Sequence, residues 1–175
     1  MPSPVGHAIA GLSSMWATAP RAGRSLAVAC ALLAAAPDID VLFGGHRGPT
    51  HSVGALVIVS GTAAAFAAAR RLPGGPITMV CGLAYASHLL LDWLGKDTAL
   101  PYGIMAFWPL TSRYYSSGAN FFLEISRRYW KPDEFILGNL KSMLQELAIL
   151  LPIAVLAYRW KTRNEERGTS NESRP

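Results

Sequence analysis

Residues 76–94 of the chain read PITMVCGLAYASHLLLDWL, and this stretch decides the class of the fold. It is almost entirely apolar, and its length suits a helix that crosses a bilayer, which needs about 17–25 such residues. His88 and Asp92 interrupt it near its end. Because residues four apart lie on one face of a helix, both side chains can reach one metal ion or two adjacent ions. The stretch therefore predicts a membrane helix with part of a metal site, although a His–Asp hydrogen bond inside a bundle is an alternative.

Four further apolar segments lie at 5–19, 25–36, 52–69 and 137–160. The last two are long enough to span a membrane, whereas the first two are short and the second ends at Pro37. Hydrophobic residues make up 51% of the 175 residues and charged residues only 15%, against about 25% charged residues in a soluble domain. We therefore expect an all-α fold, a polytopic membrane helix bundle of about five helices in contact with the lipid bilayer.

One membrane-embedded domain is expected over residues 1–160, followed by a disordered basic tail at 161–175. The segment 95–136 is rich in aromatic residues, which favour the membrane interface. Pro101 and Pro109 make one long helix unfavourable there. We expect this segment to be an interfacial, aromatic-rich lid with short helices.

The connections between the apolar segments alternate in charge. The turns after the first and third segments are basic, as is the tail, so the positive-inside rule places them in the cytoplasm. Antiparallel helices then bring every candidate ligand to the non-cytoplasmic face. The net charge of +5 thus indicates membrane anchoring, and no nucleic-acid partner is expected because no basic run alternates with exposed aromatics. No Lys or Arg precedes the first apolar segment, so no cleaved signal peptide is predicted.

The candidate metal ligands are His and Asp residues at the polar edges of the apolar segments. They are His7, Asp38, Asp40, His46, His51, His88 and Asp92. The two aspartates after Pro37 lie at the negative end of a helix, a conflict that a cation would remove, although a plain polar helix exit is the alternative. The Gly and Pro residues around Arg47 allow the two flanking imidazoles to turn inward. His7 alone would be a structural or capping residue, and its expected position on the ligand face makes it a candidate ligand.

This mixture of imidazoles and carboxylates favours a divalent metal, Zn²⁺ first, with Mn²⁺ or Fe²⁺ also fitting, as one or two ions. Arg47 offers a bidentate donor to a phosphate or carboxylate group. One spare carboxylate, Asp40 or Asp97, is the candidate general base. No Gly-x-Ser-x-Gly nucleophile elbow is present in the sequence.

Three other polar or reactive residues lie inside apolar segments. Glu146 is either functional or paired with a neighbouring Lys or Gln. Cys30 and Cys81 are interpreted as small buried hydrophobic residues in preference to a disulfide or a metal pair.

In combination, these motifs resemble the YdjM-type family of inner-membrane, metal-dependent hydrolases. The resembling stretches are His7, residues 37–40, 46–52 and 88–92, and residues 103–110, where Leu110 replaces the usual Phe. The resemblance covers roughly residues 5–130. It implies a multi-pass protein of the inner membrane of a bacterial or archaeal cell, with metal ligands at His7, Asp38 or Asp40, His51, His88 and Asp92. The His-x-x-x-Asp pattern is also distantly similar to bacterial zinc-dependent phospholipase C, which favours phosphoester hydrolysis by analogy alone.

The expected function is that of a membrane-bound metal-dependent hydrolase acting on a phosphoester or lipid-linked substrate through metal-activated water. The first alternative is a non-catalytic divalent-metal-binding membrane protein, such as a transporter or sensor. Ligands gathered at one face count against a transporter, whose sites lie near the bilayer midplane. The second alternative is a structural membrane protein whose His and Asp residues only form hydrogen bonds.

Overall fold

The computed structural model describes residues 2–45, 47–126 and 128–172, and its regular structure in these residues is helical. The elements are α1 (Pro4–Thr18), α2 (Arg24–Ala35), the 3₁₀ helices η1 (Ala36–Phe43) and η2 (Pro49–His51), α3 (Val53–Ala69), α4 (Gly74–Leu94), the π-helical turn η3 (Glu134–Gly138) and α5 (Asn139–Glu172). Within the described residues no β-strand occurs. The expected all-α class and the five helices are confirmed.

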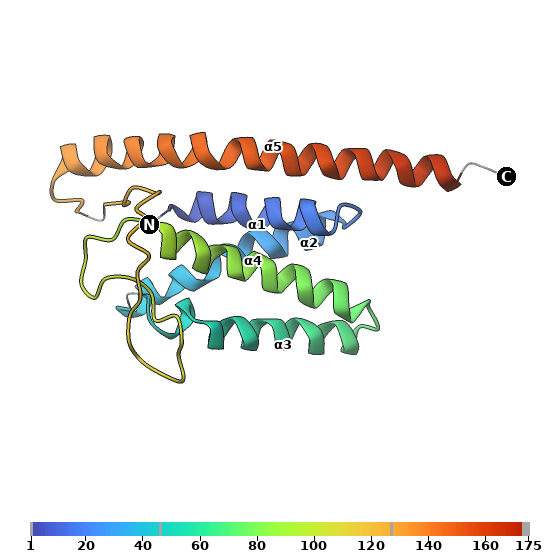
Figure 1. Cartoon of the computed structure of the whole chain (residues 1–175), viewed down its shortest axis with the longest axis horizontal. Helices are drawn as coiled ribbons and strands as arrows, with labels where there is room; N and C mark the ends of the chain where they lie inside the picture. Colours follow the sequence, from blue (N-terminus) through green and yellow to red (C-terminus); the bar gives the residue numbers. More distant parts are fainter. Residues whose placement is uncertain (1, 46, 127, 173–175) are drawn as a thin grey trace.

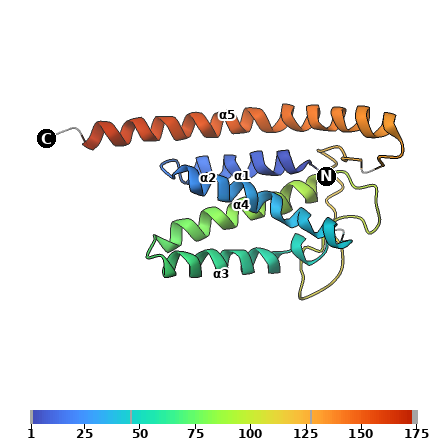
Figure 2. The same ribbon diagram turned by 180° about the vertical axis from the view of Figure 1, so that it is seen from behind.

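The five α-helices lie roughly along the long axis of the molecule (Figure 1). Helix α4 contacts α1, α2 and α3, and α5 packs along α1. Seen from behind in Figure 2, α3 forms one edge of the bundle and α5 the opposite edge. The central position of α4 matters because this helix carries His88 and Asp92.

Three helical stretches are long and apolar enough to cross a membrane: Arg24–Phe43, Gly74–Leu94 and Phe135–Gly168. Helix α2 ends at Ala35, just before Pro37 as expected, but the helical stretch continues through Phe43 as the 3₁₀ helix η1. Pro37 lies in the first turn of η1, where a missing N–H is tolerated, so η1 continues α2. The third apolar segment, expected to span, forms the shorter apolar helix α3 of 17 residues, which begins after the N-cap Ser52 and is not among the three.

Small residues let the helices approach closely. A Cβ atom added at Gly11 of α1 would lie 2.5 Å from the Cβ of Ala34 and 2.6 Å from the carbonyl oxygen of Cys30, both on the α2 side. Such close backbone approach favours helix association in a membrane, because no hydrophobic effect drives helices together there and van der Waals packing must do so. Cys30 and Cys81 are buried and not joined in a disulfide, as predicted.

The segment between α4 and η3 differs from the expectation of short helices. Its described residues 95–126 and 128–131 contain no helix, and two isolated bridges, Gly95 to Phe122 and Ile104 to Tyr115, organise it instead. The segment is tied to the bundle where the amide of Val53 donates to the carbonyl of Ala106 at 2.8 Å. Its role as a lid stays a prediction.

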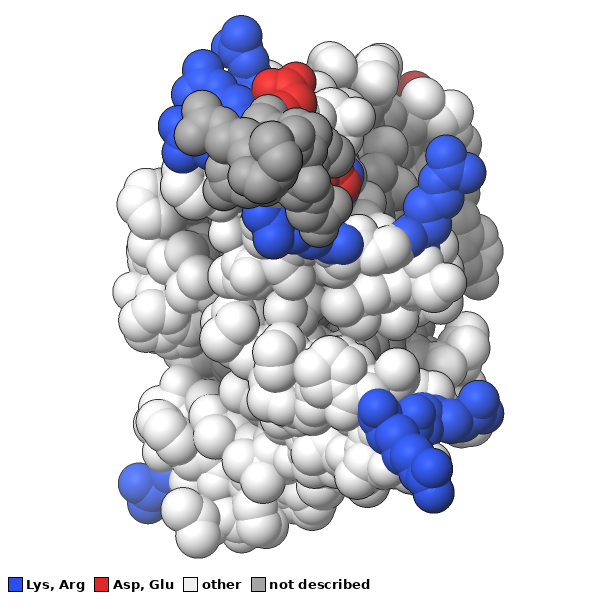
Figure 3. All heavy atoms as spheres, turned by 90° about the vertical axis from the view of Figure 1, so that its right-hand side faces the viewer, with Lys and Arg blue, Asp and Glu red and all other residues white. Residues whose placement is uncertain are grey.

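Helix α5 continues through Glu172, so most of the tail for which the sequence predicts disorder is helical. The pair Lys161–Glu165, at 2.7 Å and four residues apart, stabilises this part of the helix. The end of the bundle beneath it carries the α1–α2 and α3–α4 turns (Figure 1). Figure 3 shows that Lys and Arg predominate among the charged side chains on this face.

Candidate metal centre

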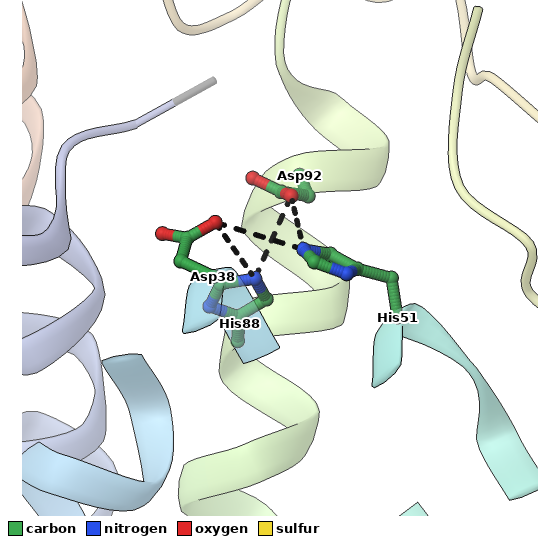
Figure 4. Close-up of side chains that lie close together, drawn as sticks. All are labelled: Asp38, His51, His88 and Asp92. Carbon is green, nitrogen blue, oxygen red and sulfur yellow. Dashed lines mark ion pairs between the residues drawn. The ribbon is translucent and has the colours of Figure 1, made fainter. Parts of the chain in front are cut away.

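The candidate ligands come together at the opposite end of the bundle. His7 lies in the first turns of α1, Asp38 in η1, His51 at the end of η2, and His88 and Asp92 in the last turns of α4. Four of them, Asp38, His51, His88 and Asp92, point toward one another (Figure 4). Each offers one ligand atom, and these atoms all lie within 4.8 Å of one another, so the group could hold a metal ion.

The distances between these atoms suit a small cation. The Oδ2 atom of Asp92 lies 3.4 Å from Nε2 of His51 and 3.5 Å from Nε2 of His88. The Oδ1 atom of Asp38 lies 3.7 and 3.9 Å from the same two nitrogens. Tetrahedral ligands about 2.0–2.2 Å from Zn²⁺ lie about 3.3–3.6 Å apart. The Asp92 distances match this spacing, and the Asp38 distances exceed it by a small margin.

The two imidazoles of this group are held in the orientation that metal ligation needs. Nδ1 of His88 faces the carbonyl oxygen of Ala34 at 2.7 Å. Nδ1 of His51 faces the hydroxyl of Thr50 at 3.0 Å and Oδ2 of Asp40 at 3.4 Å. Metal-binding histidines commonly use one ring nitrogen in this way, which orients the other toward the ion. Both Nε2 atoms are therefore directed into the cluster.

Burial strengthens the case for a cation. The side chains of His7, His51, His88 and Asp92 are at most 1% exposed. Among the described residues, both oxygens of Asp92 and the Nε2 atoms of His7, His51 and His88 have no hydrogen-bond partner. Because leaving a buried polar group unsatisfied costs about 1–3 kcal/mol, and more for a charged group, so many in one place point to a ligand. A divalent cation is the ligand that this donor set fits.

The electrostatics of the cluster agree with this interpretation. Burial lowers the pKa of His51, but three surrounding carboxylates raise it to about 10. These are the carboxylates of Asp38, Asp40 and Asp92. The negative field that holds a proton on His51 also attracts a metal cation, which competes with the proton for the ring.

His7 lies beside the four-residue group. Its Nε2 atom is 3.3 Å from Oδ1 of Asp92 and 4.0 Å from Oδ2 of Asp38. Its ring stacks on that of His88, with the centroids 3.8 Å apart and the planes inclined by 24°. The structure thus brings His7 to the same pair of carboxylates as His51 and His88.

Other predicted site residues surround the cluster. Asp40 faces Nδ1 of His51, on the far side of the ring from the four ligand atoms. Arg47 is 2% exposed, binds Asp97 through Nη1, and places Nε 3.8 Å from Oδ2 of Asp92. Asp97 also accepts from the amide of Gly103 at 2.8 Å. Asp40 and Asp97 thus each orient another site residue. The predicted ligand His46 lies outside the described residues.

Sequence reasoning missed several contacts of the site. Thr50 was not a candidate, although its place next to His51 was the available signal. The carbonyl of Ala34 left no signal, since any residue supplies one. Glu146 pairs with neither of its expected neighbours; its carboxyl accepts from the amide and the hydroxyl of Ser3, each at 2.8 Å. It therefore anchors the start of α1, one turn before His7.

Comparison with known proteins gives a family match over most of the chain. A family model described as YdjM inner membrane protein matches residues 1–165. That range includes every residue of the cluster and most of α5. No curated protein and no solved structure matches the chain significantly.

Proposed function

Because the chain belongs to the YdjM inner membrane protein family, we propose that it is a multi-pass membrane hydrolase that uses a divalent metal to cleave a phosphoester in a lipid-linked substrate. The observation that carries the proposal is the convergence of Asp38, His51 and the His88–Asp92 pair at one end of an apolar bundle. Three buried ligands and one partly buried ligand, brought together from three elements, are difficult to explain without a cation.

Asp38, His51, His88 and Asp92 would hold the metal, and Zn²⁺, Mn²⁺ and Fe²⁺ all accept this mixture of nitrogen and oxygen ligands. A bound divalent cation lowers the pKa of water and polarises a phosphoryl oxygen, which is the chemistry that hydrolysis requires. Asp38 is the most accessible of the four, with 17% of its side chain exposed. The substrate therefore enters from the η1 side.

Arg47 supplies a fixed positive charge beside the cluster. Its Nε atom has no hydrogen-bond partner within residues 2–45, 47–126 and 128–172, and Asp97 binds the other end of the guanidinium. We assign Arg47 the role of offsetting negative charge on the phosphoryl group. Since Asp40 and Asp97 contact His51 and Arg47, we assign both aspartates positioning roles in place of the general-base role expected from the sequence.

A lipid-linked substrate is supported by the apolar surface around the site. Leu42 and Phe43 in η1 are 77% and 83% exposed, and Leu100 and Leu110 in the following long segment are 77% and 91% exposed. Such side chains are stable in the membrane interface, where a lipid headgroup also lies. The basic face in Figure 3 is at the far end, which by the positive-inside rule supports a site on the non-cytoplasmic side.

The test is phosphate release from phosphorylated lipids by the purified protein in lipid nanodiscs, with and without a chelator, alongside elemental analysis. We expect at least one metal per chain, and activity that chelation abolishes and added metal restores. Asp92→Asn should lose both metal and activity, whereas Asp133→Asn, at an exposed position outside the cluster, should lose neither. Equal rates with and without chelator would refute the mechanism. Bound metal without hydrolysis of any lipid tested would favour the transporter or sensor.

A further inference from the structure

The two carboxylates at the centre of the cluster each face histidines with both of their oxygens. From this geometry we infer that the centre holds two cations bridged by Asp38 and Asp92, and that His7 is the ligand that completes the second. The inference rests on the proposed metal-dependent function and specifies how the metal is bound.

The oxygens of the bridging residues divide cleanly between two sets of histidines. Oδ1 of Asp38 and Oδ2 of Asp92 face the Nε2 atoms of His51 and His88, at 3.4–3.9 Å. The other two oxygens, Oδ2 of Asp38 and Oδ1 of Asp92, face Nε2 of His7, at 4.0 and 3.3 Å. The first set forms the four-ligand subsite, and the second forms an adjacent three-ligand subsite.

The arrangement of the imidazoles supports two neighbouring cations. The rings of His7 and His88 stack face to face, and the Nε2 atom of each ring faces the carboxylates. His7 is fully buried, and in the part of the chain that the structure describes neither its Nε2 nor Oδ1 of Asp92 has a hydrogen-bond partner. His7 also stands outside the four-residue group whose ligand atoms lie within 4.8 Å of one another. A single cation in that group leaves these buried atoms unsatisfied, whereas a second cation satisfies them.

The net charge of the centre also favours two bound cations. Counted over the described residues, the ion pairs of the centre include four carboxylates and one guanidinium: Asp92 and Asp97 face Arg47, and Asp38 and Asp40 face His51. Metal-binding imidazoles are neutral, so the excess is three negative charges. One divalent cation leaves the centre negative, which repels a phosphate group. Two leave it positive by one charge, which attracts the phosphate group, and the two-metal arrangement is a common one for phosphoester cleavage.

The experiment is a Mn²⁺ titration of the metal-free full chain in nanodiscs, followed by equilibrium dialysis and electron paramagnetic resonance. We expect two Mn²⁺ per chain and, at saturation, the spectrum of an exchange-coupled pair, since ions in such sites lie about 3.5–4 Å apart. His7→Gln should bind one Mn²⁺ and give the six-line spectrum of an isolated ion, with less than a tenfold change in the affinity of that ion. Asp133→Asn should behave as the wild type.

A wild-type protein that saturates at one Mn²⁺ with a six-line spectrum would overturn the inference, as would His7→Gln with two coupled ions. The wild-type spectrum decides the question even if the variant fails to fold. Lipid hydrolysis is measured on the same samples. Activity with one bound ion would support the proposed function and exclude the second subsite. A coupled pair of ions without activity would support the second subsite and contradict the proposed function.

Discussion

Gly6→Ala should destabilise the protein through a contact between the first and last helices. A methyl carbon at residue 6 would overlap the Oε1 and Cδ atoms of Glu146 and lie 2.9 Å from its Cγ atom. Because carbon atoms in contact lie about 3.5–4.0 Å apart, the Glu146 side chain must retreat by roughly 1–2 Å. That displacement breaks both 2.8 Å hydrogen bonds from Ser3.

The expected magnitude follows from those bonds. Each contributes about 1–3 kcal/mol, and the gain in helix propensity from Gly to Ala is about 1 kcal/mol. The net loss is therefore about 1–5 kcal/mol, and each kcal/mol lowers the midpoint of thermal unfolding by about 2–4 °C for a chain of this length. Since His7 is the next residue, the affinity for the second cation should fall as well.

Circular dichroism during heating measures the first effect, and metal titration measures the second. Gly61→Ala is the matched control, because no heavy atom lies within 4 Å of the added carbon. In a Glu146→Ala background, Gly6→Ala should no longer destabilise the protein and should stabilise it by up to about 1 kcal/mol, because the clashing atoms are gone and only the gain in helix propensity remains. The reasoning is refuted if Gly6→Ala is equally destabilising in both backgrounds, or no more so than Gly61→Ala.

Three further predictions concern the metal centre and its orientation. Burial lowers the pKa of His51, but its carboxylate neighbours raise it to about 10. A cation that binds His51 must therefore displace a proton, and its affinity should rise about tenfold per pH unit between pH 6 and 8. A constant affinity measured by calorimetry over this range would contradict the prediction. Thr50→Val should weaken metal binding about 10–100-fold by releasing His51, while Thr62→Val, whose hydroxyl binds only its own helix, should match the wild type. An impermeant maleimide should label Ala119→Cys in intact cells and Gly75→Cys only after lysis, and the reverse pattern would invert the proposed orientation.

The order of apolar segments was enough to predict most of the helices and the end of the bundle where the ligands meet. Because the helices alternate in direction, the end of α4 and the start of α1 must lie at the same end of the bundle, however the helices pack. The spacing of His88 and Asp92 was equally decisive, because four residues make one helical turn, and the two side chains lie 3.5 Å apart in the cluster. These inferences depend on local periodicity, which the sequence carries directly.

The roles of individual polar residues depended on the tertiary structure. Two aspartates follow Pro37, and only the path of η1 turns Asp38 toward Nε2 of His51 and Asp40 toward Nδ1 of the same ring. Glu146 contacts Ser3 across 143 positions of the chain, a pairing that no local pattern encodes. A side chain's partner depends on the direction in which each loop and helix face points. That direction is determined when the helices pack, because close packing and hydrogen bonding then leave each buried group few possible orientations.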